Sequence, residues 1–280
     1  MPGTLFVVAT PIGNLADLSP RAIDILGRVA LIACEDTRTS RTLLAHFAIS
    51  TRSVSLHEHN ERSASVHLVE MLRSGSDIAL ISDAGTPAVS DPGARLVGEA
   101  HRLGIRVIPV PGPSAALAAF SASGFISDRF LFAGFLPASA AARRRAIAGL
   151  DCDCSIILYE APHRIRATLA DLAAAFGTAR EVAIGRELTK KFEEMARMPL
   201  GTTLAWLEAH AHREQGEFVL VLAPEPARRR TGALDADRVL ENLLEALGPS
   251  DAAKLAAKLT GEPRKALYAR ALEIGMRGKR

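Results

Sequence analysis

The chain has 280 residues, 48% of them hydrophobic and 23% charged, with a net charge of +3. This balance is typical of a folded, water-soluble protein and excludes a disordered chain, and the length suits two domains better than one. Three cysteines without a signal peptide predict a reducing, cytoplasmic location. The first apolar run, residues 5–9, is too short to cross a bilayer, so we expect no membrane association.

The positive charge is concentrated near the C-terminus. Residues 225–280 carry 12 Lys and Arg against 8 Asp and Glu, a net charge of +4, whereas residues 1–224 carry 22 against 23, a net charge of −1. A basic terminal segment is typical of an appendage that binds nucleic acid. A solvated basic tail has the same composition, so charge alone leaves both interpretations open.

The first half of the chain alternates predicted strands with predicted helices. Apolar runs predict strands at residues 5–10, 29–33, 54–57, 77–81 and 106–110, with helical segments between them. This alternation predicts one α/β domain over residues 1–124, in which ligands bind at loops that follow the carboxyl ends of strands. The chain contains no GxGxxG sequence, which would have favoured an ordinary dinucleotide-binding fold.

The longest of these loops, from Ile81 to Gly93, is the central loop of this half. Its prolines stiffen it, and its glycines let a ligand approach the backbone. Asp91 and Pro92 are typical of the N-cap and first turn of a helix, which we expect to end at Gly104. An ordinary turn-rich loop remains the alternative.

Similar loops follow the first and fifth strands. Pro11 to Asp17 precedes a helix capped by Ser19, and Pro111 to Ala115 precedes a helix of small residues that can pack closely on the sheet. We interpret both as ligand loops, although a tight strand–helix turn explains the second equally well.

Charged residues follow the second and third strands. The carboxylates of Glu35 and Asp36 could be catalytic, but Asp36 is equally suited to cap the next helix. Two histidines flank a glutamate in the run from His57 to Glu61, which is compatible with a metal. Alternate strand residues point to opposite faces and no third ligand follows at a recognisable spacing, so we predict no metal site.

The pattern changes after residue 124. Strands are predicted at residues 130–136, 156–159, 181–185 and 217–222, which with their helices form a mixed α/β domain over residues 125–224. Tyr159 and Glu160 stand at a strand end, a usual place for ligand contacts. Arg143 to Arg145 lie on a helix that faces solvent or RNA, and Cys152 and Cys154, which have no evident partners, are interpreted as structural.

The basic segment begins with an exposed linker at residues 224–231 and continues in a helical module, residues 232–280. Three short helices are expected, the second capped by Ser250 and the third starting at Pro263. Their apolar residues are Val239, Leu243, Leu244 and Leu247, then Leu255 and Leu259, then Leu267, Tyr268, Ala271 and Leu272. With Lys254, Lys258, Arg264, Lys265 and Arg270 outward, these helices fit a nucleic-acid module. A simple helical cap is the alternative.

The loop sequences, taken in order, resemble one known family. They are T-P-I-G-N-L-x-D at residues 10–17, E-D-T-R at 35–38, H-E-H-N-E at 57–61, I-S-D-A-G-T-P at 81–87, P-G-P-S-A at 111–115, Y-E-x-P-H-R at 159–164, E-L-T-K at 187–190 and G-E-F-V at 216–219. They resemble the ribosomal RNA small subunit methyltransferase I family, which has the tetrapyrrole methylase fold. Ala161 departs from the family's usual serine, and Phe192 stands where a histidine is expected.

The resemblance implies two α/β domains of the tetrapyrrole methylase, or class III methyltransferase, type, with a cofactor cleft between them and a small C-terminal helical module. It implies transfer of a methyl group from S-adenosyl-L-methionine to the ribose 2′-oxygen of a cytidine in the decoding region of 16S rRNA, within the small ribosomal subunit. It also implies a homodimer. The cleft is expected to be lined by Pro11, Ile12, Gly13, Asn14, Ser82, Asp83, Ala84, Gly85, Thr86, Pro87, Pro113, Ser114, Ala115, Tyr159, Gly216, Glu217 and Phe218.

The catalytic base is not identified by the sequence. Glu160, Glu187 and Lys190 are candidates at strand ends, and the sulfonium is already activated, so no metal is required. The residues expected to contact RNA are Arg38, His59, Asn60 and Arg164, with Lys254, Lys258, Arg264 and Lys265 in the helical module.

Two other functions remain as alternatives. A tetrapyrrole methyltransferase of the same fold normally lacks the T-P-I-G-N-L and H-E-H-N-E strings and a basic helical tail. A non-enzymatic ribosome-binding factor would need no cofactor cleft.

Overall fold

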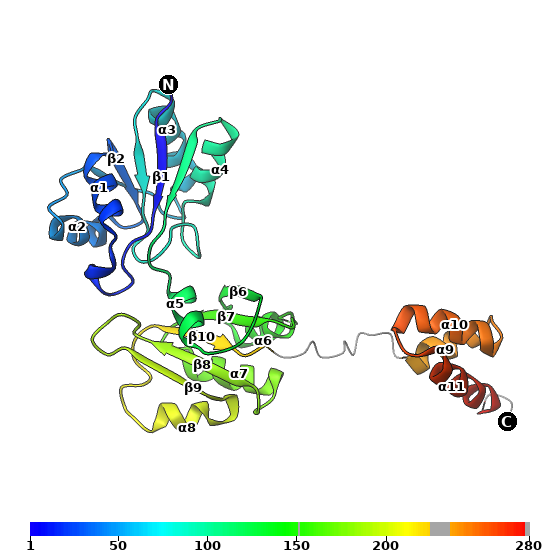
Figure 1. The fold of residues 1–280 in the computed structure, drawn as a ribbon. Coiled ribbons are helices and arrows are strands. Elements are labelled where there is room, and N and C mark those ends of the chain that lie inside the picture. Colours follow the sequence, from blue (N-terminus) through cyan, green and yellow to red (C-terminus); the bar gives the residue numbers. More distant parts are fainter. Residues whose placement is uncertain (151, 225–235, 278–280) are drawn as a thin grey trace. The chain divides into compact units, whose positions relative to one another are not determined.

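A computed structural model describes residues 1–150, 152–224 and 236–277. The chain divides into two compact units, the first made of residues 1–150 and 154–224 and the second containing the C-terminal helices (Figure 1). The first unit holds two five-stranded sheets. Across the described residues, no helix combines the length and apolar character needed to span a membrane.

The first sheet is parallel, with strand order β3-β2-β4-β1-β5. Its strands are β1 (Thr4–Val8), β2 (Leu31–Cys34), β3 (Ser53–Ser55), β4 (Ile78–Leu80) and β5 (Arg106–Val110). The five predicted strands are confirmed with small shifts at their ends. The helices that connect them are α1 (Pro20–Arg28), α2 (Thr37–His46), α3 (Glu61–Arg73) and α4 (Ala94–Arg102), with a short 3-10 turn, η1 (Leu15–Asp17), after β1.

The apolar side chains of each strand alternate between two cores. Phe6 and Val8 pack with α1 and α2 on one face, whereas Leu5 packs with α3 and α4 on the other. The chain therefore leaves the neighbouring strands β1 and β4 toward opposite faces. In an open α/β sheet such a switch point opens a crevice at the carboxyl ends of the strands, and ligands bind there.

The start of α4 differs from the prediction. The helix begins at Ala94 with Gly93 as its N-cap, and Asp91 and Pro92 precede it as part of the central loop. Its cap comes from a distant residue, because the backbone N–H groups of Gly93 and Arg95 donate to Oε1 of Glu61 at 2.9 and 3.0 Å. Glu61 is the last residue of the H-E-H-N-E string, so this string anchors the central loop.

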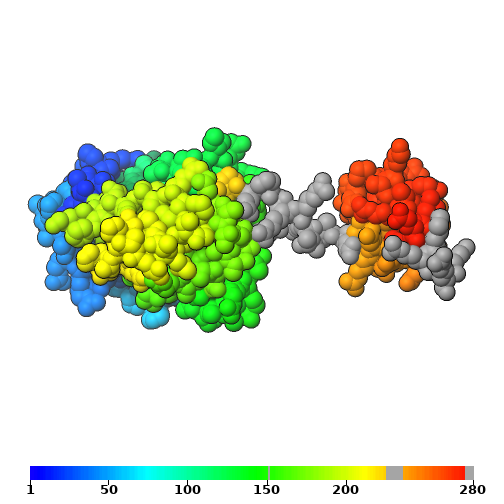
Figure 2. All heavy atoms as spheres, turned by 90° about the horizontal axis from the view of Figure 1, so that it is seen from below, coloured from blue at the N-terminus to red at the C-terminus, as the bar shows by residue number. Residues whose placement is uncertain are grey.

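The second sheet is mixed, with strand order β6-β7-β10-β8-β9. Its strands are β6 (Phe130–Phe135), β7 (Ser155–Glu160), β8 (Glu181–Arg186), β9 (Glu194–Pro199) and β10 (Phe218–Leu222). The helices of this part are α6 (Ala140–Ala148), α7 (Ile165–Phe176) and α8 (Thr203–Glu208), with a 3-10 turn, η2 (Leu200–Thr202), before α8. The surface around α8 is visible in yellow in Figure 2. Strand β9 was not predicted from the sequence, because this edge strand is half-exposed and carries charged residues.

Helix α5 (Ala115–Ala122) packs on the second sheet, although it follows a strand of the first. Ala116 and Ala119 are buried against Ile157, Ala183 and Val219. We expected this helix on the first sheet. Its small side chains do permit the predicted close packing, but the strands that they pack against are β7, β8 and β10.

Two further expectations in this region need correction. Arg143 does not face solvent or RNA, because it is buried and its Nε lies 2.8 Å from Asp171 Oδ2; Arg144 and Arg145 are exposed. Cys152 and Cys154, which we expected to lack partners, are disulfide-bonded, whereas Cys34 is a buried free thiol.

The C-terminal helices form one compact body (Figure 2). They are α9 (Ala236–Leu244), α10 (Pro249–Thr260) and α11 (Arg264–Arg277). Gly248 is the N-cap of α10, so Ser250 lies within its first turn. The predicted linker falls almost entirely outside the described residues.

The core of this helical module also differs from the prediction. It is built from Val239, Leu240, Ala252, Ala253, Ala256, Leu267 and Ala271. Five side chains that we expected to face inward are exposed instead: Leu247, Leu255, Leu259, Tyr268 and Leu272. Alanines let α10 lie close to both neighbouring helices, and its larger leucines point outward as a consequence.

Candidate active site

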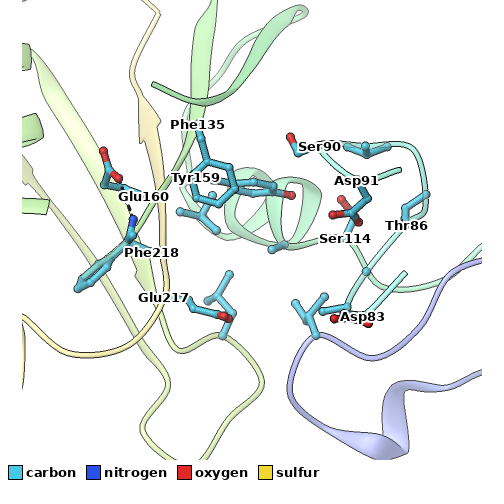
Figure 3. Close-up of a pocket in the computed structure, with 18 of the residues that line it drawn as sticks. Asp83, Thr86, Ser90, Asp91, Ser114, Phe135, Tyr159, Glu160, Glu217 and Phe218 are labelled. Atoms are coloured by element: carbon cyan, nitrogen blue, oxygen red, sulfur yellow. Dashed lines mark hydrogen bonds between the residues drawn. The ribbon is translucent and has the colours of Figure 1, made fainter. Parts of the chain in front are cut away.

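A cavity of about 380 Å³ opens in the first unit where loops of both sheets meet (Figure 3). The loops after β1, β4 and β5 provide one wall, and β6, β7, β10 and the loop after β8 provide the other. Its lining residues are Ile12, Asp83, Ala84, Gly85, Thr86, Val89, Ser90, Asp91, Ser114, Ala115, Phe135, Tyr159, Glu160, Ala161, Pro162, Leu188, Glu217, Phe218 and Val219. Apolar walls with a few convergent polar groups are typical of small-molecule sites.

The cavity brings together most of the residues expected at the cofactor cleft. Those that line it are Ile12, Asp83, Ala84, Gly85, Thr86, Ser114, Ala115, Tyr159, Glu217 and Phe218. Pro11, Gly13, Asn14, Ser82, Pro87, Pro113 and Gly216 are not among its lining residues. Some of these shape the loops instead: the Asn14 side chain accepts from Ala16 N at 3.1 Å, and the buried Ser82 hydroxyl donates to Ala84 O at 3.3 Å.

Hydrogen bonds fix the three loops of the first sheet to one another. Thr10 and Gly85 exchange backbone hydrogen bonds of 2.8 and 3.1 Å, and the Thr86 hydroxyl donates to Pro113 O at 3.1 Å. Gly85 has φ +79°, a left-handed conformation in which a larger residue would be strained. The loop backbone is therefore held in place before any ligand arrives.

The central loop also holds two non-glycine residues in the left-handed region, Ala88 and Ser90, both with φ 65°. Such strain persists where the surrounding structure enforces it, and it is concentrated at functional sites. In this conformation of the central loop, Ser90 and Asp91 line the cavity. Neither residue was predicted to line a cavity, because the pattern around Asp91 and Pro92 is typical of a helix start.

Carboxylates gather at this end of the first sheet. Burial raises the pKa of Asp91, as does the charge of Asp83, while a hydrogen bond from Ser82 opposes the change. Burial likewise raises the pKa of Glu35, with further contributions from Asp83 and Asp91. The negative potential of such a cluster favours a cationic ligand.

Of the three candidates for the catalytic base, only Glu160 lines the cavity. Its carboxylate is buried and accepts hydrogen bonds from Ala161 N at 2.8 Å and Thr168 Oγ1 at 2.5 Å. It also pairs with Arg164, whose Nε lies 3.1 Å away. A carboxylate held by this many donors is suited to fix the backbone after β7.

Glu187 and Lys190 form a charged cluster with Glu217. The Nζ of Lys190 donates to Glu187 Oε1 at 2.8 Å and to Glu217 Oε2 at 3.0 Å. Burial alone would raise the pKa of Glu187, but hydrogen bonds from Lys190 and the Glu217 backbone outweigh it and lower this pKa. Burial would lower the pKa of Lys190, yet the two carboxylates raise it. Both groups are therefore charged at neutral pH.

The residues expected to contact RNA differ in their availability. His59 is exposed, and so is Arg38, whose hydrogen bonds with Asp36 lower the pKa of that carboxyl to about 2. Asn60 instead stabilises its own loop, accepting from His57 N at 2.8 Å and donating to Ser55 O at 3.1 Å. Arg164 is held by Glu160 and by the Leu136 carbonyl.

The basic residues expected in the helical module are exposed: Lys254, Lys258, Arg264 and Lys265. Across the described residues, no group of three or more His, Cys, Asp or Glu side chains is arranged to hold a metal ion. Three further lining residues were not predicted: Phe135, Pro162 and Leu188. Pro162 lies in a family motif, but nothing in the pattern around Phe135 showed which way its ring points.

Comparison with known proteins defines the class. Residues 4–204 match the family described as Tetrapyrrole (Corrin/Porphyrin) Methylases. A solved structure of uroporphyrin-III C-methyl transferase from Thermus thermophilus, complexed with S-adenyl homocysteine, has a TM-score of 0.55 and 16% identity, and the match covers 79% of this chain and 97% of that one. The two sheets and the cavity at their loops are thus those of a tetrapyrrole methylase.

Relatives of higher sequence identity show to which family within this class the chain belongs. The ribosomal RNA small subunit methyltransferase I of Pseudomonas aeruginosa is 48% identical over 274 residues, 97% of either chain. That of Escherichia coli O157:H7 is 45% identical over 272 residues, 97% of this chain and 95% of the relative. Residues 230–275 match the RsmI C-terminal HTH domain. The chain belongs to the ribosomal RNA small subunit methyltransferase I family, as its motifs predicted.

Proposed function

We propose that this protein transfers the methyl group of S-adenosyl-L-methionine to the ribose 2′-oxygen of a cytidine in 16S rRNA, within the small ribosomal subunit. The observation that carries the proposal is the cavity, because the family's loop motifs converge on it from six separate parts of the chain. Full-length relatives named as small subunit rRNA methyltransferases support it.

The lining residues fit the proposed cofactor. Ile12, Phe218 and Val219 offer apolar surface, Ala84 is exposed, and the carboxylates of Asp83 and Asp91 complement a cationic group. When bound, the cofactor supplies an activated methyl group. The protein must then hold the ribose oxygen in line with that group and help the hydroxyl proton leave.

The protonation states favour different roles for the three candidate bases. Lys190 is protonated at neutral pH and cannot accept a proton, so it is suited to stabilise negative charge on an oxygen. Glu187 is ionised but already accepts from Lys190 and from Glu217 N. We propose that Glu187 and Lys190 act together as one charged cluster, while Glu160 positions Tyr159 and the residues after it.

The helical module is the proposed RNA-binding appendage. The four exposed basic residues predicted to contact RNA lie on α10 and α11, and the family match there is to a helix-turn-helix domain. We further propose a homodimer in the cytoplasm. An interface is supported by exposed apolar side chains on α5 and in the segment that follows it, Leu117 and Ile126.

A methylation assay tests the function. Small subunits from cells that lack this activity are incubated with the purified protein and labelled S-adenosyl-L-methionine, and the digested RNA is analysed by mass spectrometry. We expect 2′-O-methylcytidine. A base-methylated nucleoside as the sole product would contradict the proposal. Methylation of a tetrapyrrole, supplied in a parallel reaction without RNA, would support the first alternative. RNA binding without any methyl transfer would support the second.

The same assay examines the candidate bases. Replacing Glu187 by Gln or Lys190 by Met is expected to lower kcat with little effect on the cofactor's Kd. If either variant instead loses cofactor binding and retains kcat, the charged cluster belongs to the cofactor site.

A further inference from the structure

Phe135 occupies an unusual place for a large apolar side chain. It is the last residue of β6, it lines the cavity, and its side chain remains 56% exposed. Figure 3 shows its ring against that of Tyr159. The two ring centroids lie 5.5 Å apart with an interplanar angle of 61°. Single exposed apolar residues are common on protein surfaces, but an aromatic ring at a cavity that also contains carboxylates and hydroxyls calls for an explanation.

A bulge in β6 directs this ring toward the cavity. Side chains alternate along a regular strand, so Phe132 and Phe135 would point to opposite faces. The pairing with β7 shifts between Phe132 and Gly134, which makes Ala133 the extra residue. As a result both phenylalanine rings contact Tyr159, at centroid distances of 5.0 and 5.5 Å.

Gly134 makes this arrangement possible. Its φ of +61° lies in the left-handed region that favours glycine, and a Cβ at this position would lie 3.0 Å from Ser90 Oγ. The central loop can therefore approach β6 closely. This approach brings Phe135 to the same cavity as Ser90 and Asp91.

We propose that Phe135 is the platform on which the base of the acceptor nucleotide stacks while its ribose enters the cavity. This inference rests on the proposed RNA methylation. Proteins that recognise unstacked nucleotides hold their bases on aromatic side chains, and such a contact would fix the attached ribose in the cavity. The ring packs edge-to-face with Tyr159, and more than half of its surface remains exposed and available to a base.

The first test compares variants of the full-length protein. Phe135→Ala removes the ring, Phe135→Leu keeps apolar bulk without an aromatic face, and Phe135→Tyr keeps the face. Phe130→Ala is the matched control, because Phe130 lies at the other end of β6, is 44% exposed and does not line the cavity. Thermal unfolding verifies that each variant folds.

We expect Phe135→Ala to raise the KM for the RNA substrate about 5- to 100-fold. This is the loss of affinity expected when one stacking contact between a base and an aromatic ring is removed. Phe135→Leu should be intermediate, and Phe135→Tyr and Phe130→Ala should stay close to the wild type. Calorimetry should give the same Kd for S-adenosyl-L-methionine in all of them. A cofactor Kd weakened by the same factor as the KM would place the cofactor's adenine on the ring and overturn the proposal. Loss of the oligomeric state in Phe135→Ala would overturn it by assigning the ring to a subunit interface.

The second test removes the base instead of the ring. An RNA whose acceptor nucleotide lacks its base but keeps its ribose should bind the wild type more weakly, by about the factor that Phe135→Ala causes with intact RNA. The Phe135→Ala protein should lose nothing more with this RNA, because the two changes remove one interaction. Additive losses would refute the stacking. A wild type that binds RNA but does not methylate it contradicts the proposed function, and the binding measurements still decide the role of Phe135.

Discussion

At the scale of single residues, Asp91 shows how the site differs from the rest of the protein. Burial raises the pKa of its carboxyl group, and the charge of Asp83 adds to this effect. The folded state therefore binds a proton on Asp91 more tightly than the unfolded chain does. Stability falls as the pH rises from the unfolded-state pKa of about 3.9 through the higher folded-state pKa. The protein retains a carboxylate that weakens its fold at neutral pH, as functional sites often do.

Replacing Asp91 by Asn should accordingly stabilise the protein and impair the site. We expect a higher Tm than the wild type at pH 7, a gain that shrinks as the pH is lowered toward 3, and weaker binding of the proposed cationic cofactor. Scanning calorimetry across this pH range measures the first effect, and titration calorimetry the second. Asp24→Asn is the control, since Asp24 is exposed and pairs with Arg28 on the surface of α1. A Tm gain independent of pH would contradict this account.

At the scale of elements, the contact between α3 and α4 fixes the end of the central loop. Glu61 is buried, and one of its oxygens accepts from both Gly93 and Arg95. A carboxylate at a helix N-terminus satisfies orphan N–H groups and complements the helix dipole. The cap thus links the H-E-H-N-E string to the loop that lines the cavity.

Removing this cap should loosen the loop. We expect Glu61→Ala to lower the free energy of unfolding by about 1–3 kcal/mol, because two N–H groups lose their acceptor. Glu61→Gln, which keeps one acceptor oxygen, should cost less. Urea denaturation measures both, with Glu58→Ala as the control, because Glu58 is the exposed glutamate of the same string. If Glu58→Ala costs as much as Glu61→Ala, the cap contributes little.

The elements also show what the sequence could reveal. Apolar runs located nine strands, and loop motifs located most of the cavity, because both signals are local. The cap of α4 was misassigned because Asp91 and Pro92 form a good local start, whereas Glu61 competes from a distant helix. Strand β9 was missed because an edge strand needs little apolar surface. The direction of Phe135 depends on a bulge, which one sequence does not reveal.

The core of the helical module offers a direct check of another misassignment. Helical periodicity alone did not distinguish the buried alanines from the exposed leucines of α10. Leu267 is fully buried whereas Leu259 is 53% exposed. We expect Leu267→Ala to lower the free energy of unfolding of the module by about 2–5 kcal/mol, and Leu259→Ala to cost much less. Equal losses, measured by denaturation with circular dichroism, would show that Leu259 is also part of the core.

At the scale of the whole molecule, the net charge of +4 on residues 225–280 contrasts with −1 on the remainder. If the module binds RNA phosphates, deleting residues 232–280 should weaken RNA binding and flatten its dependence on salt, because fewer counterions are released. Cofactor affinity should stay unchanged, since the cavity is lined only by residues before 224. Filter binding at several salt concentrations measures this.

A charge-neutral variant separates RNA binding from a structural role. Replacing Lys254, Lys258, Arg264 and Lys265 by Gln leaves the buried core of the module intact. It should reproduce much of the deletion's effect on affinity and salt dependence. Full RNA affinity with an unchanged salt slope in this variant, together with a lowered Tm in the deletion, would show that the module is a structural cap.

The packing of α5 determines how the first unit can be divided. The helix follows β5 of the first sheet, but Ala116 and Ala119 are buried against the second sheet. A fragment that ends at residue 124 would carry this apolar helix away from the strands that cover it, and would expose it to aggregation. A split of the gene into two separately expressed pieces should therefore fall within residues 111–114, which places α5 with the second piece and leaves each sheet with all the helices that pack on it.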